Sequence, residues 1–254
     1  MLLDTWYLFI KYVRITIRMP GWSLFTLLQP LIWLLIFGQL FGNMIHLPGF
    51  PTDNYDKFFL PGVLIMTVLF GSSWSGVSLL REITSGTVDK LLVAPISRAA
   101  IVLSRIIHSA VQVIAQTLLI LLLAWAIGAT NSLSIVAVIE AMVVILLLGL
   151  SFAAISNGLA ILLQREEPLV MIGNLMTLPL MFLSSALVPK DFMPTWIKTV
   201  AIINPIDYAV EAVRAVMLDG GTGFSQYLKG VLILGIFTAA TITWAVAAFN
   251  AQRD

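Results

Sequence analysis

The stretch of sequence that decides the fold runs from Arg81 to Arg105 and reads REITSGTVDKLLVAPISRAAIVLSR. It places charged and turn-forming residues between two long apolar runs, which is the pattern of a loop that joins two membrane-spanning helices. Inside the loop, Val88, Leu91 and Leu92 follow helical spacing and therefore share one face. The pattern predicts a short amphipathic helix held just outside a membrane.

The sequence also marks the two ends of this short helix. Thr87 can cap its first turn directly after a turn at Gly86, and Pro95 ends it because the residue before a proline is pushed out of the helical region. Such a helix can lie on lipid headgroups, or it can dock against another protein that pulls on it. The physics of the sequence leaves both alternatives open, and a simply solvated loop is the commoner of the two.

Composition assigns the rest of the chain to the membrane. The 254 residues are 59% hydrophobic and 11% charged, and their mean hydropathy of +1.00 exceeds that of ordinary soluble domains. A net charge of +1 gives no polybasic surface for nucleic acid. Cysteine is absent, so the sequence offers no disulfide framework and no thiolate metal site. We therefore predict an all-α polytopic membrane protein, a single transmembrane domain over residues 1–254, without a metal site or a nucleic-acid partner.

Six apolar runs are long enough to cross the hydrocarbon core as helices. They are residues 22–41, 58–80, 101–127, 135–163, 169–188 and 227–249. Residues 1–20 precede them as an amphipathic helix with basic side chains opposite an aromatic and aliphatic face, which suits a helix in the plane of the membrane interface. Residues 81–100 form the loop described above. Residues 189–221 contain two short, half-apolar helices before the last span.

The two short helices before the last span are each too short to cross a membrane. Asn204 and Pro205 supply a cap and a first-turn proline for the second of them. Tyr208, Glu211 and Arg214 lie on this helix, and the last two are three residues apart, so they can form an ion pair. We expect a re-entrant hairpin at the outer surface, in which these five residues hold an outer gate.

Weakly polar side chains interrupt two of the apolar runs. Small residues allow close helix packing in lipid, and a path for an amphiphile needs the same weakly polar lining. Packing is the commoner role, and a substrate path is the functional hypothesis. The candidate path residues are Ser72, Ser73, Trp74 and Ser75 in the second span and Asn174 and Thr177 in the fifth.

The positions of the basic residues predict the orientation of the chain. Six spans put both termini on one side, and cytoplasmic segments carry an excess of Lys and Arg. The inner set holds nine basic residues and the outer set five when the termini are cytoplasmic. The inner ones are Lys11, Arg14, Arg18, Arg81, Lys90, Arg98, Arg105, Arg165 and Arg253, and the outer ones are Lys57, Lys190, Lys198, Arg214 and Lys229. The bias predicts a multi-pass protein of a cell inner (plasma) membrane, with both termini and the loop of residues 81–100 in the cytoplasm.

Two motifs in this sequence resemble those of ABC-2 type transporter permeases. The first is RExxxGTxxxLLVAPISR in the loop after the second span, and the second is MPxWIxxxxxxNPxxYxxEAxR from Met193 to Arg214. The order of the parts is also similar, from the interfacial helix through the spans to the short helices before the last one. The resemblance covers nearly the whole chain and is closest to the drug- and lipid-export branch, near polysaccharide and nodulation-factor exporters.

The resemblance implies the membrane subunit of an ATP-driven exporter that moves an amphiphile, such as a drug, a lipid or a lipid-linked glycan, out of the cytoplasm or inner leaflet. It implies two permease chains, as a homodimer in the lipid bilayer of a prokaryotic cell, and two separate ABC ATPase subunits. The chain would be no enzyme and would carry no cofactor, because it has no G-x-x-x-x-G-K-[ST] motif. ATP and Mg²⁺ would bind to the partner ATPase.

The resemblance also implies roles for the residues named above. Val88 to Ala94 would be a coupling helix docked in a groove of the ATPase. Glu82 could bond backbone donors at the start of the loop or a basic group on the ATPase. Spans two and five would lie at the facing surfaces of the two permeases, with the re-entrant helices over the outer end of the path. The ATPase-coupling residues would be Arg81, Glu82, Gly86, Thr87, Val88, Leu91, Leu92 and Pro95.

Two other classes of function compete with an export permease. An ion-gradient-driven secondary transporter or channel would need several intramembrane acids and bases, and Glu140 is nearly alone within the predicted spans. An intramembrane enzyme would need a catalytic set such as an HExxH motif or paired intramembrane Asp residues, and the sequence has neither. The secondary transporter or channel therefore stays as the alternative.

Overall fold

The computed structural model describes residues 2–18, 20–48, 50–52, 54–88, 93, 98–126, 128, 134–218 and 223–251. Regular structure within these ranges is entirely helical. The α-helices are α1 (Leu2–Arg18), α2 (Pro20–Leu40), α3 (Tyr55–Ser73), α4 (Ser75–Thr84), α6 (Arg98–Ala126), α7 (Ile135–Leu163), α8 (Glu166–Phe182), α9 (Thr195–Ala201), α10 (Pro205–Met217) and α11 (Phe224–Ala251). Two short 3₁₀ helices, η1 (Gly42–His46) and η2 (Lys190–Phe192), complete the set.

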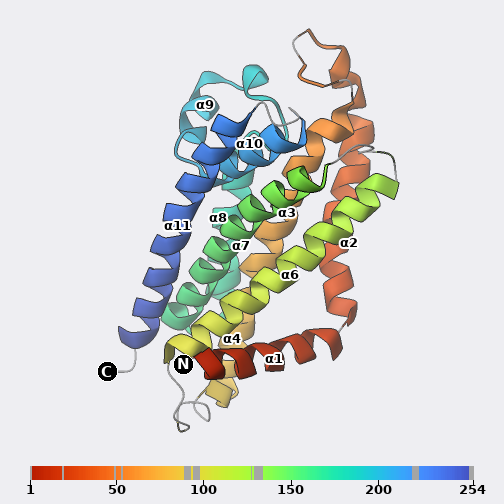
Figure 1. Ribbon diagram of the computed structural model, residues 1–254. Coiled ribbons are helices and arrows are strands. Elements are labelled where there is room, and N and C mark those ends of the chain that lie inside the picture. Colours follow the sequence, from red (N-terminus) through yellow and green to blue (C-terminus); the bar gives the residue numbers. More distant parts are fainter. Residues whose placement is uncertain are drawn as a thin grey trace.

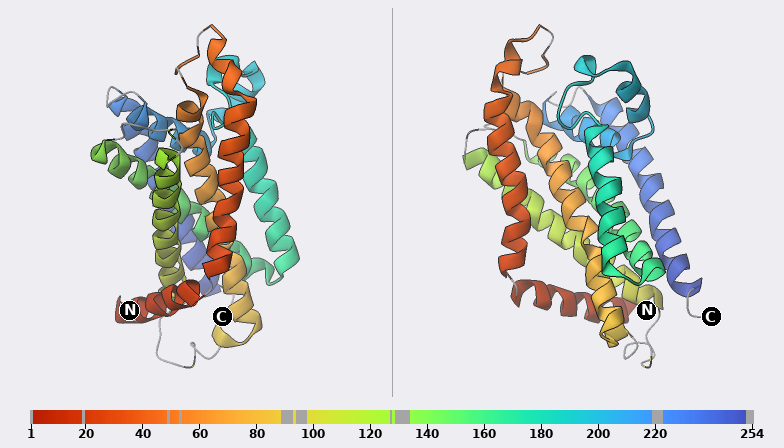
Figure 2. Two further views of the ribbon diagram at one scale, coloured as in Figure 1. Left: turned by 90° about the vertical axis from the view of Figure 1, so that its right-hand side faces the viewer. Right: turned by 180° about the vertical axis from the view of Figure 1, so that it is seen from behind.

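The long helices stand side by side as one bundle, and α1 lies across one end of it (Figure 1). The N-terminus and the end of α11 both lie at this end. The short helices α9 and α10 lie at the opposite end, beside the upper parts of α3 and α11 (Figure 2). The bundle therefore has one end carrying the crosswise helix and the start of the polar loop at the end of α4, and another end carrying the short helices.

Four stretches of the described chain are helical, long and apolar enough to cross a membrane. They are Tyr55–Thr84, Ala100–Ala126, Ile135–Leu163 and Phe224–Ala251. The chain is therefore a multi-pass membrane protein. The expected spans at residues 22–41 and 169–188 correspond to α2 and α8, which have 21 and 17 residues and run along the same bundle (Figure 2). The count of six crossings stays a prediction.

Helix α7 occupies the middle of the bundle and contacts α3, α4, α6, α8, α10 and α11. Its glycines allow these neighbours to approach closely. A Cβ atom at Gly149 would meet Val68 and Val113, and one at Gly158 would press on the ring of Trp244. Close approach through small residues is the main way in which helices gain packing energy in lipid, where the solvent is as apolar as the side chains.

Two of the expected spans differ from the helices in the structure. The expected span at residues 58–80 is divided into α3 and α4, which meet at Trp74. The expected span at residues 169–188 is helical only as far as Phe182. The segment of residues 183–189 that follows is irregular, although its composition stays apolar, because side chains of neighbouring helices bond its backbone. One such bond runs from the Tyr55 hydroxyl to the carbonyl of Leu187, at 3.1 Å.

Candidate functional site

The break between α3 and α4 is made by a side chain from α7. The hydroxyl of Ser156 donates to the carbonyl of Ser73 at 2.5 Å and accepts from the backbone N–H of Gly76 at 3.0 Å. A Cβ atom at Gly76 would collide with the Ser156 backbone, so only glycine fits here. A side chain that inserts into the backbone ladder is a recognised cause of helix breaks, and here it also satisfies the freed groups. The structure thus explains why the second apolar run is two helices.

A second set of hydroxyl and amide groups ties the start of α4 to its neighbours. The Ser75 hydroxyl accepts hydrogen bonds from Ser109 of α6 at 3.0 Å and from the amide of Asn157 of α7 at 2.9 Å. Asn157 is fully buried and also donates to the Ala153 carbonyl at 2.7 Å. Hydrogen bonds between helices in lipid add modestly to packing, and they fix the relative rotation of the helices.

The structure separates the candidate path residues into different environments. Ser72 is buried, and its hydroxyl lies against Gly149 of α7. The hydroxyl of Ser73 bonds the Leu69 carbonyl and lies 3.4 Å from that of Thr177 on α8, so these two residues are brought together. Trp74 is partly exposed at the break, and Asn174 is exposed on the outer face of α8. The six residues therefore do not form one continuous lining within a single chain.

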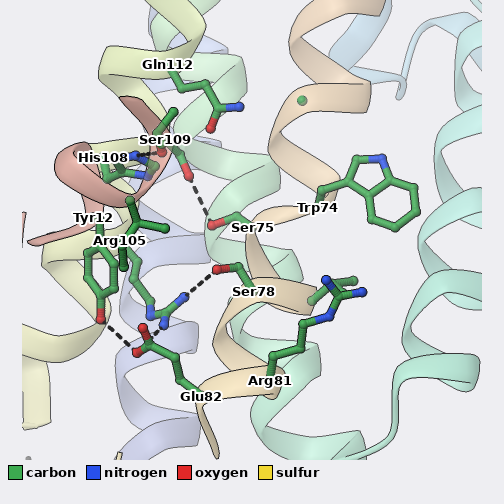
Figure 3. Close-up of a pocket in the computed structure, with 14 residues that line it drawn as sticks. Tyr12, Trp74, Ser75, Ser78, Arg81, Glu82, Arg105, His108, Ser109 and Gln112 are labelled. Atoms are coloured by element: carbon green, nitrogen blue, oxygen red, sulfur yellow. Dashed lines mark hydrogen bonds and ion pairs between the residues drawn. The ribbon is translucent and has the colours of Figure 1, made fainter. Parts of the chain in front are cut away.

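A cavity of about 420 Å³ lies between α1, the α3–α4 break and α6 (Figure 3). Its polar lining includes the hydroxyls of Ser75, Ser78 and Ser109. Tyr12 and Trp74 add aromatic surface. The wall also includes the charged side chains of Arg81, Glu82 and Arg105 and the imidazole ring of His108.

Glu82, at the end of α4, is the centre of an ion-pair network on one side of this cavity (Figure 3). Its carboxylate lies 2.6 Å from Nη2 of Arg105 and 3.1 Å from Nζ of Lys11, and it accepts from the Tyr12 hydroxyl at 3.2 Å. The Arg105 side chain is only 3% exposed and stacks over the Tyr12 ring at 4.5 Å. Burial raises the pKa of the Tyr12 phenol to about 12; the charge of Glu82 also raises this pKa, and the charge of Arg105 lowers it. The phenol therefore keeps its proton and stays a hydrogen-bond donor.

These contacts give Glu82 partners within its own chain, and its role towards an ATPase stays a prediction. A backbone donor at the start of the loop or a group on a partner protein was expected, but the carboxylate is bound by α1 and α6 of its own chain. The neighbouring Arg81 pairs with Glu166 of α8 at 2.8 Å on the exposed surface. His108 of α6 joins the same region, because its Nε2 lies 2.8 Å from the Thr16 hydroxyl of α1. The base of the loop is thus linked to three other helices.

Within the predicted coupling helix, residues 88–94, the structure describes Val88 and Val93. Gly86 has a positive φ of 68°, which glycine adopts without strain, and it makes the expected turn. Thr87 and Val88 are helical, and Val88 is fully buried among apolar side chains that include Leu79. The remaining coupling residues, Leu91, Leu92 and Pro95, lie outside the described residues.

At the other end of the bundle, Asn204 joins α10 to the end of α8. Its side chain accepts from the backbone N–H of Ile206, which confirms the predicted cap, and Pro205 is the first residue of the helix. The same amide donates to the carbonyls of Leu180 and Leu183 at 2.6 and 2.9 Å. Asn204 is only 1% exposed, so one buried side chain starts α10 and bonds the last carbonyls of α8.

The remaining outer-gate residues have partners that the sequence did not predict. Tyr208 donates to the Ile202 carbonyl at 2.7 Å. Glu211 is bound by Nζ of Lys190 at 2.6 Å and by the amide of Gln226 at 2.5 Å. Arg214, which was expected to pair with Glu211, donates to the Ser185 carbonyl at 2.8 Å and lies over the Phe58 ring at 4.0 Å.

Lys190 and Asp207 are functional candidates that sequence reasoning missed. Nζ of Lys190 lies 2.6 Å from the carboxylate of Asp207 as well as from that of Glu211. Asp207 also accepts from the backbone N–H of Ser185 at 2.8 Å and is 1% exposed. Burial lowers the pKa of Lys190, but the hydrogen bonds and charges of the two carboxylates outweigh it and raise the pKa above the usual value. No local spacing in the sequence signals a cluster that joins η2, α10 and α11.

The fold and these contacts define a class of protein. A multi-pass helical bundle has a crosswise helix and a polar loop at one end, and a cap of short helices at the other. The described residues hold no group of three or more His, Asp or Glu that could bind a metal ion. The arrangement is that of a multi-pass helical membrane protein with two different polar ends.

The comparison with known families identifies the class of membrane protein to which the chain belongs. The family model described as ABC-2 type transporter matches residues 4–218, so the chain belongs to this family. The resemblance inferred from the two sequence motifs is therefore confirmed. The chain is a membrane permease subunit of an ABC transporter.

Individual relatives agree with this assignment. A chain of Cyanophora paradoxa named as a transport permease, ycf38, is 32% identical over 212 residues, which cover 83% of this chain and 73% of the relative. The daunorubicin resistance ABC transporter permease protein DrrB1 of Streptomyces coeruleorubidus is 27% identical over 78% of this chain and 68% of its own length. A Mycobacterium tuberculosis chain named as a doxorubicin resistance ABC transporter permease, DrrC, is 25% identical over 86% of this chain and 77% of its own length.

Proposed function

We propose that this chain forms the membrane path of an ATP-driven exporter that moves an amphiphile out of the cytoplasm or the inner leaflet. Two copies of the chain would pair in the inner membrane of a prokaryotic cell and work with two ABC ATPase subunits, which would bind ATP and Mg²⁺. Family membership supports the ATPase partnership. The names of two relatives, which are permeases for resistance to daunorubicin and doxorubicin, support an amphiphilic drug or lipid as the substrate class.

The observation that carries the proposal is the set of ion pairs at the base of the loop. Arg81 and Glu82 end α4 directly before the segment that would dock on the ATPase. Through Glu82, α4 is bound to Lys11 of α1 and to Arg105 of α6, and through Arg81 it is bound to α8. A force applied to the loop would therefore reach three other helices through charged contacts, as coupling to ATP hydrolysis requires.

The proposed topology has six crossings with both termini in the cytoplasm. Support comes from the position of both ends of the described chain at the end of the bundle that carries the crosswise helix (Figure 1). The basic residues Lys11, Arg14 and Arg81 also lie on elements at this end, in agreement with the positive-inside bias. In this orientation α9 and α10 face the outside.

The proposed path runs between two copies of the chain, along α3 and α8. Ser73 and Thr177 meet at the junction of these helices. Asn174, Leu175 and Phe182 are exposed on α8, so this helix presents a mixed polar and apolar surface that a second copy would cover. Asn204, Pro205, Tyr208, Glu211 and Arg214, with Lys190 and Asp207, would hold the cap over the outer end.

Purification of the tagged chain from its native membranes tests this function directly. We expect an ABC ATPase to co-purify, and we expect the reconstituted complex to move fluorescent phospholipids or anthracycline drugs only with ATP and Mg²⁺. Each candidate amphiphile is compared with an ATP-free control in the same proteoliposomes. Movement that follows an ion gradient, in a preparation without any ATPase, would overturn the proposal and favour the secondary transporter.

A further inference from the structure

The cavity between α1, α4 and α6 contains a charged side chain that is not fully bonded. Arg105 is only 3% exposed, and it lines the cavity. Its Nη2 pairs with Glu82 at 2.6 Å and its Nη1 is 3.4 Å from the Ser78 hydroxyl, but its Nε has no hydrogen-bond partner among the described residues. A buried donor of this kind is costly to leave unmatched, so it indicates that an acceptor from outside the chain completes the site.

The charges around the cavity favour an anionic acceptor. Lys11 and Arg105 carry two positive charges, and Glu82 supplies one negative charge between them. Arg81 is already neutralised by Glu166 at 2.8 Å. Among the described charges of this network, one positive charge is unbalanced. Arginine suits phosphate oxygens because its N–H groups form a planar fork. A ligand with a single negative charge would balance the cluster.

The shape and position of the cavity favour the headgroup of a lipid-like molecule. Its volume of about 420 Å³ falls within the range of roughly 300–1,000 Å³ for small-molecule sites. Ile15 and Trp74 in its lining are 45% and 37% exposed, so the cavity has an apolar rim at the surface. One wall is α1, whose basic and aromatic composition suits the interface between water and lipid.

We propose that this cavity binds the phosphodiester headgroup of an anionic amphiphile from the inner leaflet, with Nε of Arg105 and the hydroxyl of Ser78 as its donors. The acyl chains would leave past Trp74 and Ile15 into the bilayer. The position rests on the orientation given under the proposed function. The same chemistry has two sources, because the ligand can be a resident membrane phospholipid or the amphiphile that is exported.

Native mass spectrometry of the purified, delipidated full chain tests the site without ATP. The probes are phosphatidylglycerol and phosphatidylcholine with identical acyl chains. We expect the anionic lipid to bind roughly fivefold more tightly, the ratio that corresponds to one basic residue near an anionic surface. Arg105→Gln should remove this preference, and Arg165→Gln should keep it, because Arg165 is exposed on the same side and does not line the cavity.

A second variant keeps the test decisive where Arg105→Gln fails to fold. Ser78→Phe fills the cavity without changing any charge, and we expect it to abolish the preference as well. Retention of the preference in either variant, or its equal loss in Arg165→Gln, would overturn the proposed site. Because this assay needs neither ATPase nor transport, its failure is separate from a failure of the proposed export function.

The source of the ligand is decided in proteoliposomes that contain the chain with its ATPase. Fluorescent phosphatidylglycerol that moves to the outer leaflet only with ATP identifies the ligand as cargo. Phosphatidylglycerol that binds but stays in the inner leaflet identifies it as a resident lipid. Both results support a headgroup site at Arg105, and both should disappear in Ser78→Phe.

Discussion

Replacement of Glu82 by alanine separates a structural network from an incidental surface contact. Glu82 is 16% exposed, and its strongest partner, Arg105, is 3% exposed and 2.6 Å away. Lys11, its second basic partner, is 34% exposed at 3.1 Å. Glu82→Ala would therefore leave the Arg105 guanidinium buried without its anion, whereas Lys11 would regain water.

The size of the effect follows from these exposures. Loss of one partner from a buried ion pair costs about 3–5 kcal/mol, because the other charge stays buried and unpaired. An exposed pair contributes about 1 kcal/mol or less, which sets the expectation for the control Lys11→Ala. With a shift of about 2–4 °C in melting temperature per kcal/mol for a chain of this size, Glu82→Ala should lower the melting temperature by roughly 6–20 °C. The control should lower it by less than about 4 °C.

Thermal unfolding of the purified chain in detergent, followed by tryptophan fluorescence, measures both variants in the same buffer. A third variant, Glu82→Ala with Arg105→Met, removes the charge pair together and fills the space with an apolar side chain. We expect it to melt above Glu82→Ala, because no charge is then left unpaired. The reasoning is wrong if Glu82→Ala melts like Lys11→Ala. It is also wrong if the loss in the double variant equals the sum of the losses measured for Glu82→Ala and Arg105→Met alone, because Glu82 then does not stabilise Arg105.

Four further predictions concern the proposed mechanism. Leu91→Asp should leave the chain in the membrane but uncouple ATP hydrolysis from export, and continued transport with the ATPase bound would contradict the docking role. Cysteine at Ser85 should be labelled only from the cytoplasm and cysteine at Thr195 only from outside, in a chain that has no native cysteine; labelling of both from one side would end the six-span topology. Lys190→Met should lower the melting temperature at neutral pH, because it removes the ion pairs of Lys190. The difference in melting temperature from the unchanged chain should vanish only above the raised pKa of Lys190, since the ion pair is complete below the usual lysine pKa of 10.5 and is lost as the amine deprotonates. A difference that vanishes near neutral pH would contradict the ion pair. Ser73→Phe should block export while basal ATP hydrolysis and dimer yield persist, and a loss of export in step with dimer yield would identify Ser73 as a packing residue.

Features with short-range causes could be predicted from the sequence. The long apolar runs predicted the long helices, because length and hydropathy alone decide what can lie in a membrane. Asn204 and Pro205 predicted the start of α10, because a cap and a first-turn proline act within one turn of the helix. The turn at Gly86 followed from the freedom of glycine at positive φ.

Features with long-range causes could not be predicted. The break at Trp74 depends on Ser156, which is 80 residues from Gly76, and the second apolar run looks continuous without it. Lys11 and Glu82 are 71 residues apart and meet only because α1 lies across the end of α4. α8 ends at Phe182 although the residues that follow stay apolar. The backbone of this irregular segment is bonded instead by Tyr55, Asn204 and other distant side chains.

The break at Trp74 also bears on how the proposed coupling would work. A continuous helix from Tyr55 to Thr84 would carry any push at the loop through the whole bundle. In the structure, the helix is interrupted at Trp74, and the Ser156 hydroxyl bonds the backbone groups of Ser73 and Gly76 on either side of the break. Both α3 and α4 pack against α7, but α4 is also held by Lys11 and Arg105 near its end, whereas α3 packs against α2, α6 and α10. A displacement of α4 that starts at the loop would therefore be passed to α1, α6 and α8 through the ion pairs of Glu82 and Arg81. The cavity would change shape where α4 shifts relative to α1 and α6, before the outer cap moves.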